Sequence, residues 1–271
     1  MANERNPAEE NEGPQMTKPI VYLPTVEAYD RWAEVYDTDN NVLQGVDDLE
    51  LRALLPQFLD LLPPSPKIVD VGCGTGRNTR KLLGQGQDRT IVGLDASPKM
   101  LEVASSRCNN DHHHPHQTGE SEATTTASRV DFEVYDAITS EKPPSNALSA
   151  DGVICTLVVE HVPITTLFEV LSTILKPDGV LLLTNMHPHM GAESQAGFTD
   201  PVSGEKIRPK SYVHSIPEVL EGAFAFGFDA VGEVSERAVW NEDVETLGPR
   251  ARKWIGTQVW FGVIFRKRRS S

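Results

Sequence analysis

The chain is organised around residues 67–79, which read KIVDVGCGTGRNT. A short apolar run carries the acid Asp70 near its end, and glycines follow at the alternate positions Gly72, Gly74 and Gly76. This order is typical of a strand, a tight turn and a helix that together cradle a nucleotide-like cofactor. Glycine permits the sharp turn and the close approach of a ligand, and the N-terminus of the helix offers N–H groups to an anion. The segment therefore predicts a loop that binds a phosphate or a carboxylate.

The spacing of the glycines helps to separate the candidate cofactors. Dinucleotide sites use the pattern G-x-G-x-x-G, whereas these glycines follow G-x-G-x-G. The next apolar run, Thr90–Leu94, is followed by Asp95, and an acid at the tip of a second strand can bind ribose hydroxyls. Because every adenosine carries these hydroxyls, Asp95 does not discriminate between cofactors. The glycine spacing, in contrast, disfavours a dinucleotide-binding site.

Five stretches, taken in order, resemble the class I S-adenosylmethionine-dependent methyltransferases. The likeness is to the small-molecule branch, which includes ubiquinone- and biotin-pathway enzymes and natural-product methyltransferases. The stretches are 69–76 (VDVGCGTG), 92–101 (VGLDASPKML), 131–137 (DFEVYDA), 151–162 (DGVICTLVVEHV) and 175–184 (LKPDGVLLLT). The resemblance implies an α/β fold: a doubly wound, mostly parallel seven-stranded sheet with helices on both faces and an antiparallel last strand. It also implies methyl transfer from S-adenosylmethionine to an O, N, S or C atom of a small organic acceptor, such as a secondary metabolite.

The same resemblance implies a role for the end of each strand. The glycine loop would take the methionine end of the cofactor, with Asp70 as the partner of its ammonium group. Asp95 would hold the ribose, Asp136 the adenine amino group, and Tyr29 would lie near the cofactor carboxylate. The full set of cofactor-binding residues implied in this way is Tyr29, Asp70, Gly72, Cys73, Gly74, Gly76, Asp95, Ala96, Met100, Asp136, Ala137, Cys155 and Thr156. No metal is expected.

A catalytic base is needed only where the acceptor must lose a proton. Methyl transfer is a displacement at a carbon already activated by a sulfonium, so that positioning supplies much of the rate. A phenol, a hydroxyl or an acidic carbon would need a base, whereas a free amine or a thiolate would not. Histidine is the usual base near neutral pH, and the candidates are His161, His187 and His214, with His189 close to them. Each of them is equally open to a purely structural role.

The composition limits the partners and the location of the protein. Lys and Arg total 25 and Asp and Glu total 39, giving a formal charge of −14. Such a chain repels nucleic acid, whose affinity comes largely from phosphate contacts, so we expect a small-molecule acceptor and no nucleic acid. The sparse cysteines, Cys73, Cys108 and Cys155, favour a reducing compartment. With no apolar run long enough for a bilayer and no signal-peptide core, we expect a cytoplasmic protein without membrane contact. The oligomeric state stays open.

The chain is expected to form a single methyltransferase domain over residues 20–266. Residues 1–19 read as a disordered tail, and residues 267–271 as a basic tail. Within the domain we expect a helical lid at 25–62, a histidine-rich surface insertion at 109–128 and an excursion at 185–215 that forms part of the substrate wall. Tyr29, Trp32, Ala33 and Tyr36 share one face of a predicted helix that packs on the domain, and the family resemblance implies that this helix is a lid over the cofactor.

Two other functions remain open from the sequence. The first is a protein that binds S-adenosylmethionine without methylating, either a regulatory subunit or a cofactor-assisted cyclase, because the acceptor site has no fixed signature. The second is a nicotinamide-dependent oxidoreductase. It is less well supported, because it needs a different glycine spacing and a Tyr-x-x-x-Lys or similar pair that the sequence lacks.

Overall fold

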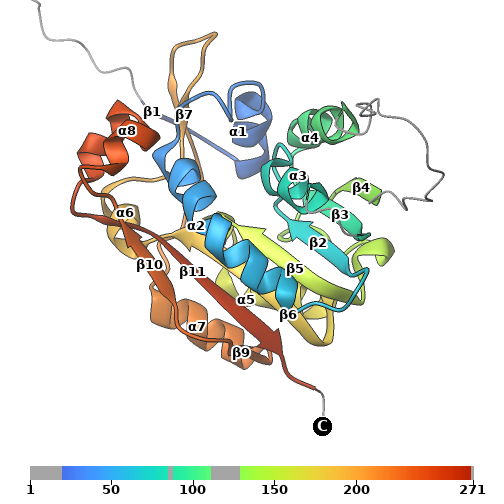
Figure 1. Ribbon diagram of the computed structural model, residues 1–271. Coiled ribbons are helices and arrows are strands. Elements are labelled where there is room, and N and C mark those ends of the chain that lie inside the picture. The colour runs from blue at the N-terminus through green and yellow to red at the C-terminus, as the bar shows by residue number, and fades with distance from the viewer. Residues whose placement is uncertain (1–19, 85–87, 111–128, 270–271) are drawn as a thin grey trace, which may run out of the picture.

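The computed structural model describes residues 20–84, 88–110 and 129–269, and in these a large sheet lies between two layers of helices (Figure 1). The expected tail at 1–19 and all but the first two residues of the expected insertion at 109–128 lie outside the described residues. Among the described residues, no helix combines the length and the apolar character needed to cross a bilayer.

The large sheet has the strand order β10-β11-β6-β5-β2-β3-β4, and β9 also pairs with β11. Neighbouring strands from β6 to β4 are parallel, and β11 is antiparallel to β6. This confirms the expected doubly wound, mostly parallel sheet with an antiparallel last strand. The strands are β2 (Lys67–Val71), β3 (Thr90–Asp95), β4 (Arg129–Val134), β5 (Ala150–Thr156), β6 (Leu175–Met186), β9 (Phe228–Ala230), β10 (Ser235–Ala238) and β11 (Gln258–Lys267).

The edge of this sheet departs from the expectation in one detail. Seven strands are expected, whereas the described sheet has eight, because two short strands, β9 and β10, pair along the outer side of β11. Gly232, with φ of +82°, lies between them. A residue in this left-handed conformation cannot continue an extended strand, and the break separates the two pairings with β11.

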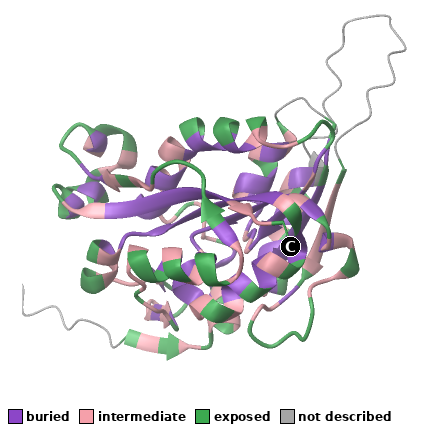
Figure 2. Cartoon of the chain, turned by 90° about the horizontal axis from the view of Figure 1, so that it is seen from below, coloured by how far each residue is buried: buried purple, intermediate pink, exposed green. Residues whose placement is uncertain are grey.

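Helices cover both faces of the sheet, and the buried residues lie on the strands and on the sides of the helices that face them (Figure 2). One apolar cluster joins the sheet to α5 (Ile164–Ile174) and α7 (Ile216–Ala225). A second joins the opposite face to α2 (Val42–Asp60) and α3 (Arg77–Leu83). Helix α7 begins with a reciprocal capping box formed by Ser215 and Glu218. The remaining helical segments are α4 (Pro98–Asn110), α6 (Pro188–Glu193), α8 (Asp243–Leu247), η2 (Ser145–Ala147), η3 (Val159–His161) and η4 (Pro249–Trp254).

Helices form in the segment 25–62, where a lid is expected, and their boundaries differ from the expected ones. Its first helix, α1 (Thr25–Trp32), ends before Tyr36, and the chain continues in turns in which Val35 N donates to the Trp32 carbonyl. These turns carry Asp37 to the glycine loop, where it accepts a hydrogen bond from Thr75 Oγ1 at 3.0 Å. Helix α2 begins at Val42, because the Asn41 side chain caps it by accepting from Leu43 N.

A second sheet, which periodicity did not reveal, has the order β1-β8-β7. It consists of β1 (Ile20–Leu23), β8 (Lys206–Pro209) and β7 (Phe198–Thr199), with β1 parallel to β8. The sheet places the start of the described chain beside the excursion at 185–215. Because Phe198 stacks on Trp32 of α1 with ring centroids 5.0 Å apart, the excursion supports the lid helix.

A buried carboxylate ties the layers together behind the glycine loop. Asp47 of α2 is fully buried and accepts from Arg77 Nη2 at 2.6 Å, Thr184 Oγ1 at 2.6 Å and Trp260 Nε1 at 2.8 Å. These partners lie at the start of α3, in β6 and in β11. One side chain therefore links α2 to three elements that surround the carboxyl ends of the strands.

Candidate active site

The first cavity, of about 280 Å³, lies at the carboxyl ends of β2, β3, β4 and β5, beneath α1. This is the edge at which open α/β sheets bind ligands. The fold brings eight of the thirteen predicted cofactor residues to its wall: Tyr29, Gly72, Gly74, Asp95, Ala96, Asp136, Ala137 and Thr156. His161, a predicted base, lines it as well.

The other five predicted cofactor residues, Asp70, Cys73, Gly76, Met100 and Cys155, do not line this cavity. Met100 and Cys155 are fully buried. A Cβ on Gly76 would lie 3.1 Å from the Ala104 Cβ, so that this glycine allows α3 and α4 to pack closely. Asp70 accepts from Thr79 Oγ1 at 2.6 Å, whereas its Oδ1 is buried without a hydrogen-bond partner among the described residues.

The glycine loop is held against the end of β3. Gly72, with φ of +71°, donates its N–H to the Leu94 carbonyl at 2.7 Å, and a Cβ there would approach the Val158 side chain to 2.3 Å. Gly74 donates its N–H to Asp95 Oδ2 at 2.8 Å. Any other residue at these two positions would be strained by its backbone conformation. The loop therefore presents backbone, without side chains, to the first cavity.

Two carboxylates at strand ends face the first cavity. Asp95 also accepts from Ser97 N at 2.8 Å, and burial raises its pKa to about 6 against the effect of these hydrogen bonds. It is therefore ionised at neutral pH. Asp136 accepts from Ile138 N at 2.9 Å and from Thr139 Oγ1 at 2.8 Å. Because a carboxylate has about four lone-pair sites, each acid can still accept hydrogen bonds from a ligand.

These groups fit the expected S-adenosylmethionine. An ionised carboxylate at the tip of β3 suits two ribose hydroxyls, and the bare backbone of the glycine loop leaves room for an amino-acid end. Asp70 lies behind the wall of the first cavity, where burial raises its pKa to about 7, and its buried Oδ1 does not face the cavity directly. The described residues contain no cluster of His, Cys, Asp and Glu arranged to hold a metal.

Tyr29 and His161 form a hydrogen-bonded pair at the roof of the first cavity. The ring nitrogen Nδ1 of His161 lies 3.2 Å from the Lys210 carbonyl, to which it can only donate, and this leaves Nε2 to accept from the Tyr29 hydroxyl at 2.7 Å. Burial lowers the pKa of His161 to about 4 and raises that of Tyr29. Both side chains are therefore neutral at pH 7.

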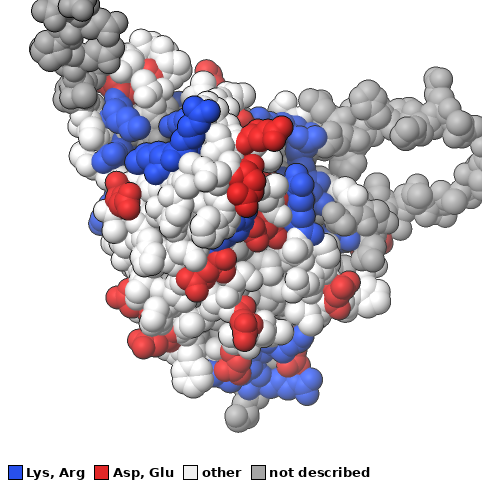
Figure 3. Space-filling view, turned by 60° about the vertical axis from the view of Figure 1, so that its left-hand side comes forward, with Lys and Arg blue, Asp and Glu red and all other residues white. Residues whose placement is uncertain are grey.

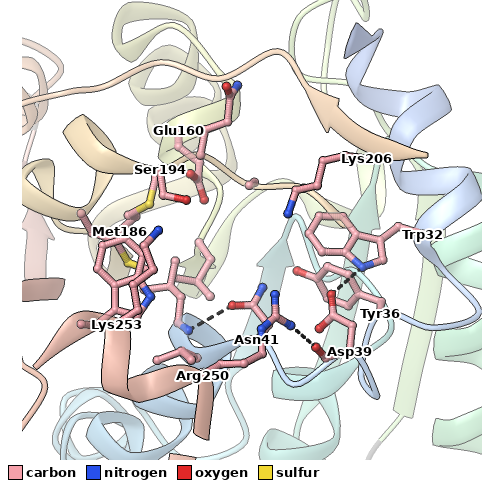
Figure 4. A pocket seen from close by; sticks show the side chains of 18 of the residues that line it. Trp32, Tyr36, Asp39, Asn41, Glu160, Met186, Ser194, Lys206, Arg250 and Lys253 are labelled. Atoms are coloured by element: carbon pink, nitrogen blue, oxygen red, sulfur yellow. Dashed lines mark hydrogen bonds between the residues drawn. The ribbon is translucent and has the colours of Figure 1, made fainter. Parts of the chain in front are cut away.

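The second cavity, of about 470 Å³, is seen in Figure 4. It meets the first cavity at Tyr29, Tyr36 and Leu157, which line both. Its wall comes from the start of α2, from α6, β8 and η4, and from the loop after α6. The expected excursion contributes Met186, Met190, Ser194, Gln195, Ala196, Gly197 and Lys206. Residues far apart in the sequence thus enclose a space beside the predicted cofactor site.

Glu160 lines the second cavity, a position that the sequence analysis did not single out. It is 3% exposed, and its Oε2 has no hydrogen-bond partner among the described residues. Its Oε1 lies 3.8 Å from His161 Nε2, close to the junction with the first cavity. Burial raises the pKa of Glu160 to about 8. The only signal in the sequence was its position beside the candidate His161.

The other candidate bases line neither cavity. His187 has a structural position: its Nε2 lies 2.9 Å from Glu236 Oε2, and its Nδ1 caps α6 by accepting from His189 N. The ring of His214 stacks on that of Tyr212, with centroids 5.6 Å apart. The fold thus brings one of the three predicted bases, His161, to the candidate site.

The sequence of this chain is similar to the sequences of known methyltransferases. Residues 69–183 match the model of a methyltransferase domain. The chain is 44% identical to an uncharacterized methyltransferase of Emericella nidulans over 269 aligned residues, which cover 90% of this chain and 91% of that protein.

Solved structures share the fold at low identity. One is magnesium protoporphyrin IX methyltransferase from Synechocystis with bound S-adenosylhomocysteine, with a TM-score of 0.57, 15% identity and coverage of 90% of this chain and 95% of that chain. Another is the [4+2]-cyclase SpnF, with a TM-score of 0.56, 16% identity and coverage of 92% and 100%.

Proposed function

This chain belongs to the class I S-adenosylmethionine-dependent methyltransferases, and from that premise we propose that it methylates a small organic acceptor held in the second cavity. The observation that carries this proposal is the junction of the two cavities at Tyr29, Tyr36 and Leu157. A cofactor in the first cavity and an acceptor in the second would meet there. The net charge of −14 supports a small molecule over a nucleic acid.

In the first cavity we propose that Asp95 holds the ribose hydroxyls, that Asp136 meets the adenine and that the glycine loop receives the amino-acid end. S-Adenosylmethionine, when bound, supplies a methyl carbon activated by a sulfonium. The part of the protein is to bind and align the reactants, which can contribute on the order of 7–11 kcal/mol. It also excludes water by closing the cavity under α1.

In the second cavity we propose Glu160 as the base that takes the acceptor's proton. Its carboxylate is buried, has an oxygen without a partner and lies close to the junction. A pKa of about 8 suits a base that works near neutral pH. His161 is the weaker candidate, because both of its ring nitrogens are engaged and its pKa is about 4. We propose that His161 positions the Tyr29 hydroxyl between the two cavities.

The test of this proposal is turnover. Purified protein is incubated with methyl-labelled S-adenosylmethionine and a panel of aromatic hydroxy, amino and thiol compounds, and both S-adenosylhomocysteine and the methylated product are measured. We expect stoichiometric formation of the two products with at least one small acceptor. Labelling of added RNA or protein in place of every small acceptor would contradict the proposal. Binding of S-adenosylmethionine without any S-adenosylhomocysteine would instead indicate a non-methylating protein, such as a cyclase.

The location is a separate proposal. The three cysteines, Cys73, Cys108 and Cys155, are all buried, and none of them forms a disulfide. Free thiols are usual in proteins of the reducing cytoplasm, and we propose that compartment for the enzyme.

A further inference from the structure

The second cavity gathers three cationic side chains from two distant parts of the chain. Lys206 comes from β8, and Arg250 and Lys253 come from η4. Figure 4 shows Lys206 pointing into the cavity from one side, with Arg250 on another. Figure 3 shows Lys and Arg side chains gathering near the top of one face of the molecule.

Lys206 is the cation with unused donors. It is half-buried, and its Nζ has no hydrogen bond or ion pair with any residue that the structure describes. Arg250 is partly engaged, because it donates to the backbone carbonyls of Asp39 and Asn40. Lys253 lies with its Nζ 4.2 Å from the Trp254 ring centroid, a contact that leaves its hydrogen-bond donors free. The cavity thus holds N–H donors that have no acceptor within residues 20–84, 88–110 and 129–269.

The protein does not balance these charges locally. Two carboxylates, Asp39 and Glu160, share the wall with the three cations. Glu160 is largely protonated at pH 7, since burial raises its pKa to about 8. The pKa of Lys206 is lowered first by burial and then by the nearby charges of Arg208, Arg250 and Lys253, although Asp39 opposes this. Arg250 and Lys253 are exposed, whereas Lys206 is half-buried in the cavity, and a perturbed charged group in a cleft is a candidate for a functional site.

Aromatic and apolar side chains form much of the rest of the wall, beside the polar Asn41, Ser194 and Gln195. Trp32, Tyr36 and Trp254 contribute rings, and Met186 and Met190 contribute flexible apolar side chains. Sites for small molecules commonly combine such a wall with a few charged groups that fix the orientation of the ligand. The rings suit a flat body, and the cations suit an anion attached to it.

We infer that the acceptor is an aromatic carboxylate whose anionic group is bound by Lys206, with Arg250 and Lys253 beside it. This inference rests on the proposed function, because it assigns the second cavity to the acceptor. The carboxylate is held by charge-assisted hydrogen bonds, and the same contacts turn the nucleophilic group toward Glu160 and the junction of the cavities. An uncharged analogue of the same shape leaves the cations unpaired and binds less well.

A matched pair of probes tests the inference. The protein is loaded with S-adenosylhomocysteine and titrated calorimetrically with 2-naphthoate and with 2-naphthamide, which differ in charge but hardly in shape. We expect the acid to bind at least ~10-fold more tightly than the amide, which corresponds to about 1.4 kcal/mol. Lys206→Gln should remove most of this preference while leaving the affinity for the amide unchanged. Lys142→Gln, an exposed lysine outside both cavities, is the control and should keep the preference.

Three results would overturn the inference: no binding of the acid, equal binding of acid and amide, or a preference that survives in Lys206→Gln. The turnover assay separates this failure from that of the proposed function. If neutral acceptors are methylated and acids are not preferred, the proposed methyltransferase activity is supported and the proposed carboxylate site is contradicted. If the acid binds through Lys206 but no small acceptor is methylated, the proposed function is contradicted and the proposed anion site is supported.

Discussion

Glu160 and His161 show how one short turn divides two neighbouring residues between two cavities. Both lie in η3, and successive residues of a 3₁₀ turn point about 120° apart. Glu160 therefore faces the second cavity and His161 the first. The same burial acts on both residues in opposite directions, raising the pKa of the acid to about 8 and lowering that of the imidazole to about 4. Both groups are thus kept largely uncharged at neutral pH.

Glu160→Gln should remove the base and leave the shape of the site intact. We expect kcat/KM of the wild-type enzyme to rise with pH up to about 8, because the base must first lose its proton. In Glu160→Gln, kcat should fall by about 10²–10⁴-fold for an acceptor that must be deprotonated, and the rising limb should disappear. The exposed Glu141→Gln is the control and should keep the wild-type profile. If kcat/KM of Glu160→Gln still rises with pH as in the wild type, another residue is the base.

Asp95→Asn should weaken the binding of the cofactor. The ribose hydroxyls would lose a charged acceptor, and hydrogen bonds to charged groups contribute about 1.5–3 kcal/mol. We expect the Kd for S-adenosylhomocysteine to increase by ~10–100-fold in calorimetric titration. Asp88→Asn is a matched control, because Asp88 is an exposed acid just before β3, whereas Asp95 ends that strand. Unchanged affinity in Asp95→Asn would show that the ribose lies elsewhere.

At the scale of elements, the lid depends on a segment far along the chain. Helix α1 packs in one apolar cluster with Met100 of α4, Phe198 of β7 and Ile207 of β8. It is also tied to α4 by a hydrogen bond from Ser97 Oγ to Asp30 at 2.6 Å. The excursion at 185–215 therefore has two structural roles. It lines the second cavity, and it packs against α1, which covers the first cavity.

Asp47→Ala should destabilise the packing of α2 behind the site. It would leave Arg77 without its buried partner, and breaking a buried ion pair in this way costs about 3–5 kcal/mol. Thr184 and Trp260 would also lose their acceptor. We expect a loss of about this size in the free energy of unfolding, measured with urea.

Asp60→Ala, at the exposed end of the same helix, is the control for this change and should alter the free energy of unfolding by no more than about 0.5 kcal/mol. An equally small effect of Asp47→Ala would mean that the buried group contributes little to stability.

At the scale of the whole molecule, buried acids link stability to pH. The pKa of Asp70 is raised from an ordinary value near 4 to about 7, first by burial, while hydrogen bonding from Thr79 opposes the shift. Between these two values the folded chain holds a proton that the unfolded chain has released. The stabilisation from Asp70 is therefore fully present below pH ~4 and is lost as the pH rises to about 7.

Asp70→Asn should consequently become more stable, relative to the wild type, as the pH rises from ~4 to about 7 in the absence of cofactor. The relative gain should be on the order of a few kcal/mol and should level off above this window. Urea unfolding at a series of pH values measures it. Gln57→Ala replaces an exposed neutral residue of α2, and it should change the free energy of unfolding by the same small amount at every pH. A pH-independent difference between Asp70→Asn and the wild type would contradict the assigned shift.

Local residue patterns were sufficient for the main sheet. The apolar runs before Gly72 and Asp95 could only be buried strands, because both faces of a central parallel strand are covered. Gly72 and Gly74 adopt the left-handed conformations that glycine favours, and Asp95 lies at the tip of its strand as expected. These features depend on a few neighbouring residues, and so the class of fold and most of the first cavity could be predicted.

The tertiary structure decided what lies around this frame. The pairing of β1 with β8 joins residues near 20 to residues near 206, and no local pattern encodes which strand is its partner. Cys155 and Met100 match the family motifs in sequence, yet the direction of each side chain depends on packing that buries them away from the first cavity. The second cavity exists only because β8, η4 and the start of α2 converge.

The sequence by itself thus determined the α/β fold, the glycine loop and the acids at the strand ends, because these arise from local backbone and burial requirements. The tertiary structure alone decided that Glu160, Lys206 and Lys253 share one cavity, because contacts between distant segments are set by the packing of the whole chain.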